Sequence, residues 1–151
     1  MGIWRGNLGG VLRDLGDLPA AREQLERALA ITEAALGPDH PTAGIRRNNL
    51  ASVLQDLGDL PGAREQFERA LAIGEAELGP DHPTMGARRN NLGMVLQDLG
   101  DLPGARDQFE RAVAISEAAL GPDHPDVRTL RSNLDLLISR QREVPPEFPT
   151  S

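Results

Sequence analysis

Apolar and polar positions alternate along this chain with the period of an amphipathic α-helix, about 3.6 residues. Between residues 41 and 57 the apolar positions with this spacing are Ile45, Leu50, Val53, Leu54 and Leu57. A second such segment, 60–78, carries Leu60, Ala63, Phe67, Ala70, Leu71 and Leu78 on the face expected to be buried. No segment alternates with a period of two, so the sequence predicts helices and no strand.

Turn residues mark where these helices begin and end. Gly58 and the pair Gly79-Pro80 follow the two segments, as glycine does at the left-handed position after a helix. Asp59, followed by Leu60-Pro61, predicts the start of the second helix. The Asp-His-Pro runs at 39–41 and 81–83 predict the start of the first helix, with the aspartate as cap and proline in the first turn.

The whole pattern recurs every 42 residues. Residues 48–89 and 90–131 share 31 identities in 42 aligned positions, and residues 6–47 and 48–89 share 32. A period in this range is typical of a solenoid, in which each unit buries its apolar face against its neighbours. We predict an all-α solenoid of seven helices: repeats over about 1–40, 41–82 and 83–124, a C-terminal capping helix over 125–142, and a proline-rich tail over 143–151.

Residue size predicts how the two helices of a unit pack. Small side chains at Ala51, Ala63, Ala70 and Gly93 stand where two helices would approach closely. Bulky fillers, Phe67 and Phe109 with Leu25 in the first unit, would occupy the remaining space between the helices. Each unit is therefore expected to be an antiparallel helix pair.

These helix–turn–helix units resemble tetratricopeptide repeats (TPRs). The residues that carry the resemblance are Leu50-Ala51, Leu54, Gly58-Asp59, Ala63, Phe67 and Ala70-Leu71, with counterparts Leu92-Gly93, Leu96, Gly100-Asp101, Ala105, Phe109 and Ala112-Val113. The 42-residue form, with Asn48-Asn49-Leu50 and Gly79-Pro80-Asp81-His82-Pro83, is similar to the repeats of kinesin light chains and of bacterial TPR-like arrays. The resemblance implies a right-handed superhelix whose first helices line a concave groove for protein or peptide partners.

Composition narrows the chemistry that the chain can perform. The formal net charge is −7, all 16 basic residues are arginine, and cysteine is absent. Disulfides, thiolate metal sites and lysine chemistry are thereby excluded. An acidic chain with few aromatic residues is not expected to bind nucleic acid, and no apolar run is long enough to span a membrane. We expect a cytoplasmic protein that is not an enzyme, with no catalytic residue, metal or cofactor, and His40, His82 and His124 at helix starts.

Polar residues on the first helices are the candidate peptide-binding site. The resemblance implies that the asparagine ladder hydrogen-bonds the main chain of an extended peptide; the alternative is that these amides cap or bridge neighbouring helices. The candidates are Asn7, Asn48, Asn49, Ser52, Gln55, Asn90, Asn91, Met94, Gln97 and Asn133. Asp56 and Asp98, further along this face, make the expected groove mildly acidic.

Arginine recurs at Arg5, Arg47, Arg89 and Arg131, near the expected line of helix packing. The favoured interpretation is a structural ladder, in which each arginine lays its stem on apolar surface and pairs with an acid of the next unit. Binding of a peptide carboxylate is the alternative. Three i,i+4 pairs, Glu23/Arg27, Glu65/Arg69 and Asp107/Arg111, are expected on a solvated outer face.

A second function class is a structural or self-associating repeat array, which we would expect to be part of a larger regulatory protein. Ile3, Trp4 and Leu8 lie on a first helix that has no preceding unit in this sequence. Their apolar side chains are therefore expected to be available for head-to-tail contact with another copy of the chain. The partner in this alternative is the chain itself.

Overall fold

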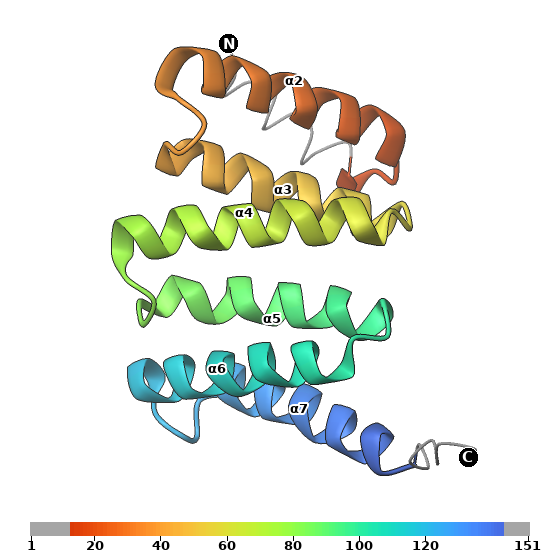
Figure 1. Ribbon diagram of the computed structural model, residues 1–151, viewed down its shortest axis with the longest axis vertical. Helices are drawn as coiled ribbons and strands as arrows, with labels where there is room; N and C mark the ends of the chain where they lie inside the picture. The colour runs from red at the N-terminus through yellow and green to blue at the C-terminus, as the bar shows by residue number, and fades with distance from the viewer. Residues whose placement is uncertain (1–12, 144–151) are drawn as a thin grey trace, which may run out of the picture.

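The computed structural model describes residues 13–143 as a row of six α-helices. They follow one another in chain order along the long axis of the molecule, and successive helices run in opposite directions (Figure 1). No strand occurs in this part of the chain, so the all-α prediction is confirmed; the seventh helix, expected at the N-terminus, falls outside the described residues. The helices are α2 (Leu18–Leu36), α3 (Pro41–Asp56), α4 (Leu60–Leu78), α5 (Pro83–Asp98), α6 (Leu102–Leu120) and α7 (Pro125–Glu143).

Local hydrogen bonds define the ends of the second helices. The side chain of Asp59 accepts a hydrogen bond from the backbone N–H of Gly62 at 3.1 Å, and caps α4 as predicted. Asp101 caps α6 through Gly104 in the same way, at 3.0 Å. At the other end, Gly79 has a φ of +89°, and its N–H donates to the carbonyl of Glu75. The predicted glycine stop is confirmed, because only glycine adopts this conformation without strain.

The caps of the first helices differ from the prediction. The N-cap of α3 is His40 and that of α5 is His82, where the sequence analysis assigned the preceding aspartates. Each imidazole Nδ1 accepts a hydrogen bond at 3.2 Å from a backbone N–H, that of Thr42 or Thr84. The aspartate assignment was wrong because proline occupies the first helical position, which makes the histidine before it the capping residue.

The core lies between the paired helices and contains the predicted fillers. Phe67 and Phe109 are each 1% exposed, and Ala51 and Ala63 are fully buried. A Cβ added to Gly93 would lie 2.7 Å from Cε1 of Phe109, so α5 approaches α6 more closely than any larger residue at this position would allow. The prediction of small residues facing large ones is confirmed here.

Three positions of the predicted apolar stripes are exposed to solvent. Ile45 is 52% exposed, Leu57 is 37% exposed and Leu78 is 43% exposed. The buried side of α3 instead includes Ala43, Arg47 and Leu50, so the stripe of core contacts passes beside Ile45. Leu78 is the last residue of α4 and lies beyond the packed part of the helix pair. Helical spacing alone identified the helices but not the complete buried stripe.

Candidate functional site

Most of the predicted site residues lie together on one face of the first helices, α3, α5 and α7. On α3, Asn49 is exposed while Asn48, Ser52 and Gln55 are half-buried. On the later helices, Asn90, Asn91, Gln97 and Asn133 are half-buried, and Met94 is 42% exposed. The predicted residues Asn7, Ile3, Trp4 and Leu8 lie outside the described residues.

Two polar contacts join neighbouring units across this face. The side-chain amide of Asn133 donates to Oδ1 of Asn90 at 3.1 Å, and Nε of Arg13 pairs with Oδ2 of Asp56 at 2.8 Å. In each contact the partners are 43 residues apart, so position i of one unit meets position i + 43 of the next. For Asn90 and Asn133, the bridging role that the sequence left open is observed.

Other amides on this face retain unused hydrogen-bonding capacity. The side chains of Asn49, Asn91, Gln55 and Gln97 make no hydrogen bond to another described residue, and the buried Oδ1 of Asn48 also has no such partner. A carboxamide can donate and accept at the same time, which matches the alternating groups of an extended main chain. These side chains are therefore the free polar groups of the face.

A hollow of about 220 Å³ opens on the same face near the C-terminal end of the row. It lies between α5 and α7, with Phe109 of α6 also in its lining, and its apolar walls are Met94 and Leu136, the latter 62% exposed. Its polar wall consists of Gln97, Asp98, Asn133 and Arg140. Sequence reasoning missed Leu136 and Arg140, although the 42-residue register places them opposite Met94 and Asp98.

The recurring arginines form a ladder inside the molecule. Arg47, 4% exposed, donates from Nη1 to Oε1 of Gln66 on α4 at 2.8 Å, and from Nη2 to the carboxylate of Glu33 on α2. Arg47 thus ties its own first helix to the second helices on both sides. Arg89 makes the same two contacts, with Gln108 and Glu75, and Arg131 pairs with Glu117 at 2.7 Å. The structural ladder is observed at these three positions, but the acid lies on the preceding unit and not on the next one as predicted, because each first helix packs against the second helix before it. Arg5 lies outside the described residues.

One further arginine is held within the packing between units. Nη1 of Arg88 donates to the main-chain carbonyl of Ala70 at 2.7 Å. Burial lowers the pKa of the Arg88 guanidinium, because desolvation disfavours its charged form. This side chain therefore serves the contact between α4 and α5, and it is not one of the free polar groups.

The outer face carries ion pairs along the second helices. Glu23/Arg27 is formed at 2.6 Å and Glu65/Arg69 is stretched to 3.9 Å. The expected Asp107/Arg111 pair is not formed, because aspartate is one methylene shorter than glutamate and does not reach the guanidinium. Three unpredicted pairs, Arg22–Glu26, Arg64–Glu68 and Arg106–Glu110, also lie on this face. The hydrogen bond to Glu68 raises the pKa of Arg64.

The three histidines, His40, His82 and His124, lie at helix starts as predicted. Each caps a separate helix, with Nδ1 of His124 accepting from the N–H of Asp126 at 3.2 Å. Among residues 13–143 there is no group of three or more His, Asp or Glu side chains placed to hold a metal ion. Within the same range, no helix is both long and apolar enough to cross a bilayer.

Antiparallel helix pairs that stack with a fixed sequence period define an α-solenoid of helix–turn–helix repeats. The family model described as Tetratricopeptide repeat matches residues 1–76, 42–115 and 87–134. The chain belongs to the tetratricopeptide repeat family. None of the curated proteins compared with it matches.

Solved structures share this fold at low sequence identity. A putative kinesin light chain of Podosopora anserina with nearly identical TPR-like repeats superposes with a TM-score of 0.79 at 24% identity, over 96% of this chain and 77% of that one. BtubC (BKLC) from P. vanneervenii gives 0.71 at 19% identity, over 97% and 66%. The first TPR of Spaghetti (RPAP3), bound to an HSP90 peptide, gives 0.69 at 15% identity, over 93% of each chain. At these identities the likeness establishes the fold.

Proposed function

We propose that this chain is a non-catalytic protein-interaction module that binds an extended peptide along the face of its first helices. The observation that carries the proposal is the hollow between α5 and α7, where the exposed apolar side chains of Met94 and Leu136 stand beside amides and charges. An apolar side chain of the ligand would fill this hollow, and Gln97 would bond to the main chain beside it. One similar solved structure, that of the first TPR of Spaghetti (RPAP3), holds a peptide.

The free amides extend the site along the row. Asn49 and Gln55 on α3 repeat as Asn91 and Gln97 on α5, so equivalent groups recur once per unit. A ligand lying across the first helices would meet them in succession. Main-chain recognition by amides confers affinity with little sequence selectivity, and the apolar hollow would then supply the selectivity.

A selection from a random library of short acetylated peptides tests the proposal. The wild-type chain should enrich peptides with one large apolar residue, and Leu136→Glu should lose their capture because it places a charge in the hollow. Leu120→Glu is the matched control, since Leu120 is also exposed, at 47%, but lies at the end of α6. Equal loss of capture in both variants, or full capture by Leu136→Glu, would contradict the proposal.

A further inference from the structure

One ion pair on the face of the first helices shows how this face binds a cation. Nε of Arg13 lies 2.8 Å from Oδ2 of Asp56 on α3, and the two side chains are 42% and 39% exposed. These residues are 43 positions apart, like the hydrogen-bonded Asn90 and Asn133, so the same register applies along the described row. A guanidinium from one unit therefore lies against a carboxylate from the next.

The two positions of this ion pair carry different residues in the later units. Between α3 and α5 the register brings Gln55 toward Asp98, and between α5 and α7 it brings Gln97 toward Arg140. Asp98 and Arg140 are exposed, and neither forms an ion pair with a described residue. Because glutamine carries no charge, the first of these contacts keeps an unpaired carboxylate and the second keeps an unpaired guanidinium.

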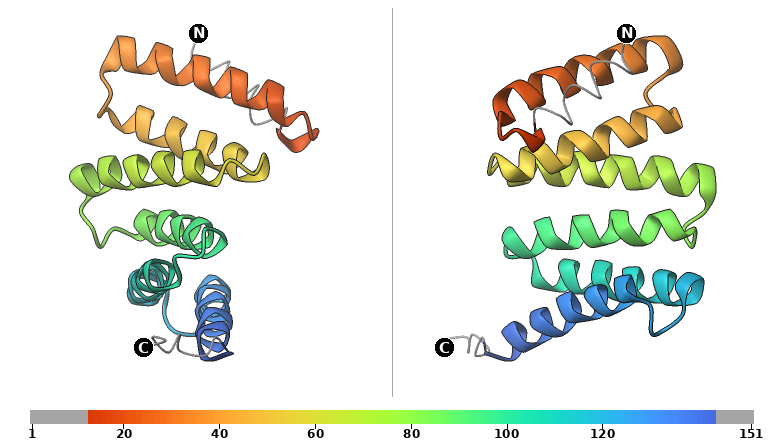
Figure 2. Two further views of the ribbon diagram at one scale, coloured as in Figure 1. Left: turned by 45° about the vertical axis from the view of Figure 1, so that its right-hand side comes forward. Right: turned by 180° about the vertical axis from the view of Figure 1, so that it is seen from behind.

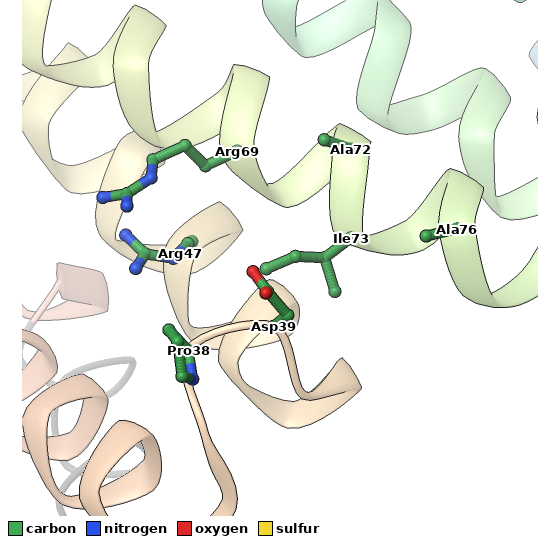
Figure 3. Close-up of a pocket in the computed structure, with 7 residues that line it drawn as sticks. All are labelled: Pro38, Asp39, Arg47, Arg69, Ala72, Ile73 and Ala76. Carbon is green, nitrogen blue, oxygen red and sulfur yellow. The ribbon is translucent and has the colours of Figure 1, made fainter.

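The charges of a larger pocket on the other side of the row are already neutralised. Figure 3 shows this pocket, of about 370 Å³, between the α2–α3 connection and α4. Its Arg47 is bound by the carboxylate of Glu33, and its Arg69 lies 3.9 Å from Glu65. Since Asp39 also lines this pocket, it has no excess of positive charge. The unpaired charges on the face of the first helices are therefore the better candidates for contact with a ligand.

The hollow between α5 and α7 combines these two charges with its apolar walls. On α5, Asp98 lies one helical turn after Met94, and both line the hollow. On α7, Arg140 lies one turn after Leu136 in the same way. With one charge of each sign, the hollow cannot select a ligand by its total charge. It can select a ligand by the arrangement of its charges, because the negative group lies on α5 and the positive group on α7.

We infer that the ligand of the proposed site is a bipolar peptide, in which an apolar residue is flanked by a basic residue on the α3 side and an acidic residue on the α7 side. The apolar side chain fills the hollow, the basic group binds Asp98, and the acidic group binds Arg140. Every second side chain of an extended peptide points the same way, so one residue separates each charge from the apolar residue. This inference rests on the proposed function and adds the charge pattern of the ligand. Exposed ion pairs contribute little affinity, so the charges mainly determine how the peptide lies.

NMR titration of the full chain with capped pentapeptides that share a central leucine tests this inference. The peptides are acetyl-Arg-Ala-Leu-Ala-Glu-amide, its reversed order acetyl-Glu-Ala-Leu-Ala-Arg-amide, and the neutral acetyl-Gln-Ala-Leu-Ala-Gln-amide. The tighter of the two charged peptides should bind about threefold or more tightly than the neutral one, because it adds two exposed ion pairs. The variant Asp98→Asn/Arg140→Gln should bind all three peptides equally. Asp107→Asn/Arg111→Gln is the matched control, since it removes the same two charges from α6, where they do not pair with each other, and should keep the preference.

Three outcomes would overturn the inference while leaving the proposed function in place. The first is equal affinity of the wild-type chain for the charged and neutral peptides. The second is a preference for charged peptides that survives in Asp98→Asn/Arg140→Gln. The third is equal or tighter binding of acetyl-Arg-Ala-Leu-Ala-Arg-amide, which would show only the attraction of cations to a chain of net charge −7. If none of these peptides bound saturably, the proposed function itself would be contradicted, and this inference with it.

Discussion

At the scale of single residues, the ladder arginines differ in burial, and burial determines how much a charged side chain contributes to folding stability. Arg89 and Arg131 occupy the same position in successive units, yet the side chain of Arg89 is 5% exposed and that of Arg131 is 43% exposed. Arg89 also has a second partner, Gln108, on the following second helix. Arg131 has no such helix after it among the described residues. The same residue type thus forms a buried link between helices in one unit and an exposed ion pair in another.

This difference predicts unequal effects of the same substitution. Arg89→Met leaves Glu75 and Gln108 without their partner and should lower the free energy of unfolding by ~1.5–3 kcal/mol. Arg131→Met removes a solvent-screened pair and should cost less than ~1 kcal/mol. Urea unfolding of both variants measures the two values. Equal losses would contradict the claim that burial increases the contribution of a ladder arginine to stability.

The core fillers give a second prediction at this scale. Phe67→Ala empties a site that is 1% exposed, and should cost ~3–5 kcal/mol. Leu78→Ala, at a position that is 43% exposed, serves as the control with an expected cost below ~1 kcal/mol. Denaturant unfolding followed by circular dichroism provides both values. A loss below ~1 kcal/mol for Phe67→Ala would contradict its place in the core.

At the scale of the helix, the sequence predicted most of the fold because the signals are local. Gly58, Gly79 and Asp59 act within one turn of their own position, and the helices they bound begin and end within a residue or so of the prediction. Ile45 was placed wrongly and Leu136 was missed, because their exposure depends on which neighbouring helix passes nearby. That information lies in the stacking of units, and the spacing within one helix does not contain it.

The contribution of the histidine caps to folding stability can be tested by substitution. His82→Ala removes the acceptor for the N–H of Thr84 at the start of α5, and should cost ~0.5–2 kcal/mol. His82→Asn keeps a side-chain acceptor at the cap and should retain most of the stability. Thermal unfolding distinguishes the two variants. If His82→Asn were as unstable as His82→Ala, the imidazole would have a role other than capping.

At the scale of the whole molecule, the helix axes turn progressively along the stack, and α7 crosses the neighbouring α6 at a visible angle (Figure 2). The side-chain contacts at a spacing of 43 residues and the hollow between α5 and α7 both follow from this stacking. Neither is contained within one unit. For this reason the sequence predicted the polar residues on the face of the first helices but not the hollow between α5 and α7.

Self-association remains a prediction from Ile3, Trp4 and Leu8. If the apolar end docks on another copy, Trp4→Glu should lower the sedimentation coefficient at high protein concentration, because a charge would enter the contact. Sedimentation velocity of both forms over a range of concentrations measures this. Identical sedimentation at every concentration would contradict head-to-tail association in solution.

The most direct test of the proposed peptide-binding face is to measure peptide affinity in the variant Asn49→Ala/Asn91→Ala. The peptide is one selected by the wild-type chain. Both amides lack partners among the described residues, so the variant should lose capture while its melting temperature barely changes. Wild-type affinity should depend only weakly on salt, because the contacts are amide hydrogen bonds. A variant that melts far lower and still binds would show that the asparagines are structural bridges, and would contradict the assignment of the binding face.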